Sequence, residues 1–169
     1  MITNFISWRQ ELLFVGRIIQ DGDTTVSSDE RHRRFMRFVE MVDALTGAEG
    51  SAAIEALFDS IQVQDSYGAY CSIDHALSRF PEGDYLFGLV MALPRLIREL
   101  PDQAGEHLVS IANGIGGKWG HQVDLLNAII SKTAPDIRDV IISFIRSQET
   151  SGWLTNRVGV LCPLNTNSH

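Results

Sequence analysis

Residues 80–101 read FPEGDYLFGLVMALPRLIRELP and form the most apolar passage of the chain. The apolar run inside it, from Tyr85 to Leu93, is nine residues long, whereas a membrane-spanning helix needs about 20. Phe87 and Met91 make a second side of the passage apolar. The passage therefore predicts a helix enclosed by neighbours in the core, not a membrane segment. Its main stripe recurs at helical spacing: Leu86, Leu89, Val90 and Leu93.

Prolines and a glycine punctuate this passage. Pro94 lacks the N–H that would donate to the carbonyl of Val90, so we expect the helix to kink or stop there. A short second arm should then end at Pro101. Gly88 has no side chain, which permits close contact with another helix. The passage therefore predicts the central helical hairpin of the fold.

The rest of the chain is dominated by helical periodicity, and no alternation of apolar and polar residues is long enough to require a sheet. Ser27 and Glu30 form a capping-box pattern that begins one helix, and Gly47 ends it. Pro101 and Pro135 each mark the first turn of a helix. We therefore predict an all-α fold of about eight helices. Other expected helices cover residues 2–20, 51–61, 66–79 and 119–132.

A weak internal repeat favours one kind of all-α architecture. At an offset of 34 residues, Leu96, Pro101, Asp102, Leu108 and Ile111 match Ile130, Pro135, Asp136, Ile142 and Ile145. This period suits HEAT or tetratricopeptide hairpins, which bury their apolar faces by stacking on one another. We therefore expect an irregular array of antiparallel helical hairpins, a HEAT-like α-solenoid, in preference to a four-helix bundle.

We expect the 169 residues to form one domain with its own core. It should comprise an N-terminal helical pair (1–47), the hairpin array (48–150) and an extended C-terminal tail (151–169), in which Val158, Val160 and Leu161 pack as a strap. The N-terminus does not read as a secretory signal, so a cytoplasmic location is expected. Cys71 and Cys162 are expected to be buried free thiols.

The net charge of −7 is unevenly distributed. Residues 1–84 carry 14 acids and 7 bases, whereas residues 85–169 carry 7 of each. No Lys or Arg occurs from Phe38 to Ser78. A field of one sign repels nucleic acid and attracts a basic partner. We therefore expect no nucleic acid and no membrane among the partners.

Two motifs invite a phosphate-binding interpretation, and ordinary structural roles explain both better. The basic run Arg31-His32-Arg33-Arg34, with Arg37, is expected to be a solvated helix face paired with Asp29, Glu30 and Glu40. Residues 114–119 read GIGGKW, which departs from the phosphate-loop and dinucleotide patterns in its glycine spacing and in the residue after the lysine. This segment is expected to be a turn between helices.

Catalytic or metal chemistry has one weak candidate. Cys71, Asp74 and His75 share a helix face at i, i+3 and i+4, a spacing that could serve a metal ion or a thiolate and its base. The sequence marks no partner for them elsewhere, and no G-x-S-x-G elbow occurs. We therefore expect no enzyme, no cofactor and no metal site, and packing or surface roles for these residues.

The segments DYLFGLV at 84–90, LPRL at 93–96 and LPDQA at 100–104 resemble the immunity family numbered thirty of bacterial polymorphic toxin systems. The resemblance covers residues 66–150 and carries mainly structural motifs. It implies a small helical protein of the contact-dependent growth inhibition type, which binds and neutralises a cognate toxin domain. Many such toxins are nucleases with basic surfaces, which an acidic inhibitor could occlude stoichiometrically.

The base-free acidic segment supplies the expected partner-binding residues. Tyr67 joins them because a tyrosine beside carboxylates suits a recognition surface, while Tyr70 is expected in the core. The alternative function is a helical-repeat scaffold or adaptor that binds a host protein or peptide in its groove. Oligomeric state does not follow from the sequence. The expected partner-binding residues are Glu55, Asp59, Asp65, Tyr67, Asp74, Glu82 and Asp84.

Overall fold

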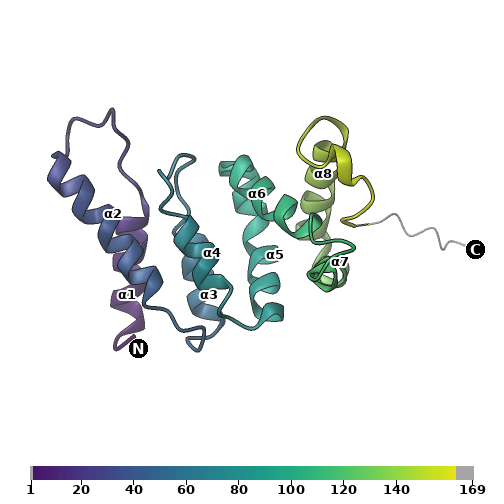
Figure 1. Ribbon diagram of the computed structural model, residues 1–169, viewed down its shortest axis with the longest axis horizontal. Coiled ribbons are helices and arrows are strands. Elements are labelled where there is room, and N and C mark those ends of the chain that lie inside the picture. The colour runs from purple at the N-terminus through teal and green to yellow at the C-terminus, as the bar shows by residue number, and fades with distance from the viewer. Residues whose placement is uncertain (1, 163–169) are drawn as a thin grey trace, which may run out of the picture. The chain divides into compact units, whose positions relative to one another are not determined.

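Within residues 2–162, which are the residues that it describes, the computed structural model contains eight α-helices, one short 3-10 helix and no strand (Figure 1). The prediction of an all-α fold with about eight helices is confirmed. The helices are α1 (Phe5–Gly16), α2 (Ser28–Asp43), α3 (Ser51–Asp59), α4 (Cys71–Leu77), α5 (Glu82–Glu99), α6 (Pro101–Ala112), α7 (Gly120–Lys132), α8 (Pro135–Ser151) and η1 (Thr155–Arg157).

The contacts divide the chain into two compact units, Met1–Gly88 and Leu89–His169, with the boundary inside α5. Two compact units that share a helix can fold as one domain or as two, so the single domain stays a prediction. In the first unit α1 packs on α2 and on α3, and α2 packs on α4. The first helices of two successive hairpins, α1 and α3, are therefore in contact, and so are the second helices, α2 and α4. Such contacts are typical of hairpin arrays, but the solenoid itself stays a prediction.

The core of the first unit is built from one apolar face of each helix. Leu12, Phe38, Ile54 and Phe58 are almost completely buried there, and they come from α1, α2 and α3. Tyr70 is 6% exposed, and its ring meets Phe38 edge-on with centroids 5.8 Å apart. The prediction that Tyr70 belongs to the core is confirmed.

The passage at 80–101 forms one continuous helix after Pro81, and α5 runs through Pro94 without a stop. A proline in a helix removes one hydrogen bond but keeps a helical φ, so the fold tolerates it here. Phe87 is 52% exposed and Met91 is 44% exposed. The prediction that α5 is enclosed on every side is therefore wrong, because its buried residues cover one stripe. That stripe is the predicted one: Leu86, Leu89, Val90 and Leu93, each 0% exposed.

Gly88 confirms the expected close contact between helices. A Cβ placed on Gly88 would lie 2.5 Å from the Cγ2 atom of Ile54 on α3 and 3.7 Å from the ring of Phe58. Real Cβ contacts are longer than the first of these distances. The backbone of α5 therefore lies directly against α3 at this point.

Two helix boundaries differ from their predicted positions by several residues. The first helix ends at Gly16 instead of Gln20, where the carbonyl of Gly16 accepts from the Tyr70 hydroxyl (2.9 Å) and from the Ile18 amide (2.9 Å). The fourth helix begins at Cys71 instead of Ser66, because Tyr67 (φ +50°) and Gly68 (φ +83°) interrupt helical geometry.

The predicted cap of α2 forms in part. The Ser27 hydroxyl accepts from the Glu30 amide at 3.3 Å. The carboxylate of Glu30 pairs instead with Arg33 and Arg34 on the same helix, at 2.7 and 2.8 Å. Gly47 has the expected positive φ of +89°, but α2 already ends at Asp43, so the prediction that Gly47 ends this helix is wrong.

In the second unit α6 packs on α7, and α7 packs on α8. Pro101 and Pro135 are the first residues of α6 and α8, as predicted.

Residues 152–162 form turns and the 3-10 helix, so the prediction of an extended strap is wrong for this part. Leu161 is buried as expected, whereas Val158 is 67% exposed. The predicted tail from 163 to 169 lies outside the described residues.

Polar side chains hold this C-terminal segment against α7 and α8, which explains why it turns back. Asn127 donates to the Val160 carbonyl (3.1 Å) and accepts from the Cys162 amide (2.8 Å). Glu149 is buried; it pairs with Arg146 at 2.6 Å and accepts from the Gly159 amide at 2.7 Å. These contacts satisfy backbone groups that an extended strap would leave to water.

Candidate functional site

Most basic side chains of the first unit form ion pairs or hydrogen bonds within the unit. Arg37 binds Glu11 through two hydrogen bonds of 2.7 and 3.1 Å, and lies 3.6 Å from Glu40. Arg33 and Arg34 share Glu30. The interpretation of this run as a solvated, acid-paired helix face fits these contacts.

Two further arginines of the first unit also have internal partners. Arg9 on α1 pairs with Asp59 on α3 at 2.7 Å, across 50 residues of sequence. Arg79 donates to the carbonyls of Asp43 and Leu45 at 2.9 and 2.6 Å. Besides Asp59, seven acids lie from Asp43 to Asp84, where Arg79 is the one Lys or Arg of the sequence. This set is called the acidic segment below: Asp43, Glu49, Glu55, Asp65, Asp74, Glu82 and Asp84.

Glu55 and Asp84 are the clearest unpaired members of the acidic segment. Both are exposed, and no basic group among the described residues lies within ion-pair distance of either. Asp74 is exposed on α4. Burial, and secondly the charge of Asp74, raise the pKa of Tyr85 on α5 well above its usual value. The field of Asp74 thus reaches the first turns of α5.

The structure does not bring the predicted partner-binding residues into one cluster. Asp65 and Tyr67 lie in the loop before α4, whereas Glu82 and Asp84 lie in the first turn of α5, after α4. Figure 1 shows that loop and the start of α5 at opposite ends of α4. Asp59 contacts Arg9 and therefore serves the fold. The acidic segment is accordingly a spread surface.

Tyr67 holds two loops together. Its amide donates to Asp65 Oδ1 at 2.9 Å, and its hydroxyl donates to Gln20 Oε1 at 3.3 Å and accepts from the Asp21 amide at 3.2 Å. Gln20 in turn donates to the Asp65 carbonyl at 3.0 Å. Tyr67 is 46% exposed. It is therefore both a surface residue and a structural clip, and this second role was not apparent in the sequence.

The three candidate catalytic residues lie on α4 and do not form a metal-binding group. Cys71, Asp74 and His75 are all exposed on α4, so the prediction that Cys71 is buried is wrong. The structure holds no group of three or more His, Cys, Asp or Glu side chains placed to bind a metal ion, over residues 2–162. Residues 113–119 form the turn between α6 and α7, as expected for the glycine-rich segment.

No family model, curated protein or solved structure matches this chain. The likeness to the immunity family thus rests on the residues that carry it, and the function has to be argued from the chemistry of the surface.

In the described part of the chain, every helix is too short or too polar to cross a bilayer.

Proposed function

We propose that this protein binds a basic protein through its acidic segment and inhibits it, as the immunity protein of a bacterial toxin domain. The observation that carries the proposal is the separation of charges in the first unit. Most of its arginines have internal partners, whereas Glu55 and Asp84 are exposed and lie in no ion pair among the described residues. The toxin would be a nuclease or another effector with a basic substrate site.

Inhibition would follow from occlusion. Carboxylates laid along a phosphate-binding track take the place of the substrate's charges, and the partner's lysines and arginines provide the counter-charges. The same field accelerates encounter at low ionic strength, so association should slow steeply as salt is added. We propose that this takes place in the cytoplasm, where a nuclease finds its substrate.

The proposal expects a toxin domain to be encoded beside this gene, and the test is co-expression and binding with that domain. Cells that express the toxin should survive only when this protein is present. Substituting both Glu55 and Asp84 by Lys should weaken binding by more than about tenfold, since each close charge pair contributes roughly 1.5 kcal/mol or more. Calorimetry measures the affinity.

Two exposed acids of the second unit provide a matched control. Asp102→Lys with Asp136→Lys changes the net charge equally, and both residues lie at helix starts. This variant should retain most of the affinity. Equal loss in both double variants would make the effect one of net charge and contradict the site, and failure of rescue by the native chain would contradict the function.

A scaffold or adaptor role is the second candidate. The contacts between α1 and α3 and between α2 and α4 favour it, because successive packed hairpins present a continuous binding surface. Rescue from the neighbouring toxin separates the two functions, since an adaptor for another protein would give none.

A further inference from the structure

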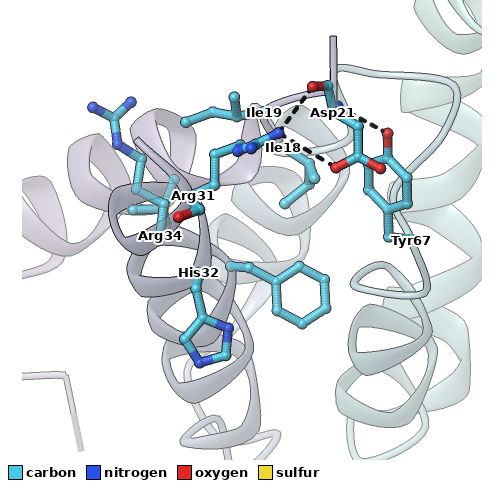
Figure 2. Close-up of a pocket in the computed structure, with 10 residues that line it drawn as sticks. Ile18, Ile19, Asp21, Arg31, His32, Arg34 and Tyr67 are labelled. Atoms are coloured by element: carbon cyan, nitrogen blue, oxygen red, sulfur yellow. Dashed lines mark hydrogen bonds and ion pairs between the residues drawn. The ribbon is translucent and has the colours of Figure 1, made fainter. Parts of the chain in front are cut away.

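A pocket of about 280 Å³ opens in the first unit between the C-terminal end of α1, the first turns of α2 and the loop before α4 (Figure 2). Its floor is apolar and includes Val15, Ile18 and Phe35. Arg31, Asp21 and Tyr67 lie at its polar side. An apolar floor with a few convergent polar groups is the usual composition of a ligand site.

Arg34 also lines this pocket, but it pairs with Glu30 at 2.8 Å, so Arg31 is the arginine of the lining that could bind a ligand. Its side chain is 26% exposed, and its Nη1 atom donates to the carbonyl of Asp21 at 3.0 Å. Among the described residues, its Nε and Nη2 atoms have no hydrogen-bond acceptor. The other arginines of α2 instead have carboxylate partners at 2.7 or 2.8 Å. Arg31 therefore keeps donors for a ligand.

The ion pair between the carboxylate of Asp21 and Arg31 is weak, so a ligand could displace this carboxylate. Its Oδ1 atom lies 3.4 Å from Arg31 Nη1, and its side chain is 85% exposed. Exposed ion pairs of this length contribute little free energy. Figure 2 shows Arg31 and Tyr67 contacting Asp21 from two different elements, so the backbone of Asp21 is fixed while its carboxylate is free to turn outward.

We propose that this pocket binds a carboxylate attached to an apolar group. The apolar group would lie on Ile18, Val15 and Phe35, while the carboxylate displaces that of Asp21 and pairs with Arg31. The planar guanidinium suits a two-oxygen ligand, which gains two charge-assisted hydrogen bonds where Asp21 makes one long contact. The ligand is a small aromatic or aliphatic acid, or the C-terminal residue of a peptide with an apolar side chain. The pocket does not depend on the acidic segment or on a toxin.

The test is a titration of the isotope-labelled full chain with 3-phenylpropionate, followed by amide chemical shifts. Shifts should concentrate in residues 15–21, 28–35 and 67. The neutral 3-phenylpropionamide should bind about tenfold more weakly, because it cannot pair with a guanidinium. Equal binding of acid and amide would overturn the proposal, as would shifts elsewhere.

Three variants sharpen the test. Arg31→Gln should weaken binding of the acid by about tenfold, whereas Arg33→Gln on the same helix, whose side chain is 73% exposed, should leave it unchanged. Asp21→Asn removes the internal competitor and should strengthen binding severalfold. Weaker binding to Asp21→Asn, or equal effects of the two arginine variants with unchanged melting temperatures, would contradict the assignment.

A tripeptide Gly-Gly-Phe with a free or an amidated C-terminus distinguishes the two sources of ligand. If the free-acid peptide binds more tightly than 3-phenylpropionate, the natural ligand is a chain terminus; if it binds more weakly, a small acid. If neither compound binds, the proposal fails.

Discussion

The phenolic hydroxyl of Tyr70 donates a hydrogen bond of 2.9 Å to the carbonyl oxygen of Gly16, 54 residues earlier in the chain. The hydroxyl oxygen of Tyr70 in turn accepts from the amides of Gln62 and Val63, at 3.0 and 3.2 Å. One buried side-chain atom thus joins the end of α1 to the loop after α3. All three partners are backbone groups, so the Tyr70 hydroxyl connects two segments of the main chain directly.

Tyr70→Phe should destabilise the protein by about 1–3 kcal/mol, since it leaves backbone groups without their partner in a place that water reaches poorly. Chemical denaturation measures this change. Tyr67→Phe is the matched control: its hydroxyl lies at an exposed site, and water replaces the lost bonds. Equal effects of the two substitutions would mean that burial of the Tyr70 hydroxyl does not matter.

Gly88→Ala should destabilise the protein by about 1–3 kcal/mol, because the new methyl group overlaps Ile54 on α3. Gly83→Ala, in the first turn of the same helix, meets no atom within 4 Å. It should stabilise the protein by about 0.4–1 kcal/mol, since alanine restricts the unfolded chain. Thermal melts of both variants give the two signs directly, and a stabilising Gly88→Ala would contradict the close contact.

The two thiols should differ in reactivity. Burial, opposed by the positive charge of Arg146, raises the pKa of Cys162 to about 11, whereas Cys71 is exposed on α4. At pH 8 the reactive thiolate is therefore scarce at Cys162. A colorimetric disulfide reagent should react rapidly with one thiol per chain, and Cys71→Ala should abolish that fast phase. Fast reaction in the Cys71→Ala variant would show that the segment around Cys162 opens.

The pair between Arg37 and Glu11 should make stability depend on pH. The hydrogen bond from Arg37 lowers the pKa of the Glu11 carboxyl below its ordinary 4.5. A folded-state pKa below the unfolded value stabilises the protein above pH 4.5, and this contribution is lost as the pH falls through the folded-state pKa.

The stability difference between the native chain and Glu11→Gln should therefore be present at pH 7 and vanish at strongly acidic pH. Both side chains are nearly half exposed, so the difference should be no more than about 1 kcal/mol and smaller in high salt. Urea denaturation at several pH values measures it. A difference that persists to the lowest pH would assign the effect to packing and not to charge.

Helix starts and ends could be predicted where they depend on nearby residues. Pro101 and Pro135 are the first residues of helices. Proline is tolerated there because the first turn of a helix does not use the backbone N–H that proline lacks. Gly47 takes the positive φ expected of it, although α2 ends before it, at Asp43. By contrast, Gly16 ends α1 early because Tyr70 binds its carbonyl, a contact that no local pattern announces.

The candidate site could be predicted in composition but not in geometry. The absence of bases from Phe38 to Ser78 marked the acidic segment in advance. Distances between helices decide that Asp59 pairs with Arg9 and that Arg31 lines a pocket. Such distances are a property of packing, which a linear pattern of residue types does not contain.

The sequence by itself determined the all-α class, the buried stripe of α5 and the sign of the surface charge. Each follows from spacing along one helix or from a count of residues. Only the tertiary structure decided that Phe87 and Met91 are exposed, that the segment after α8 turns back, and which carboxylates remain unpaired. These outcomes depend on which atoms of distant segments come within a few ångströms, because burial and ion pairing act through space.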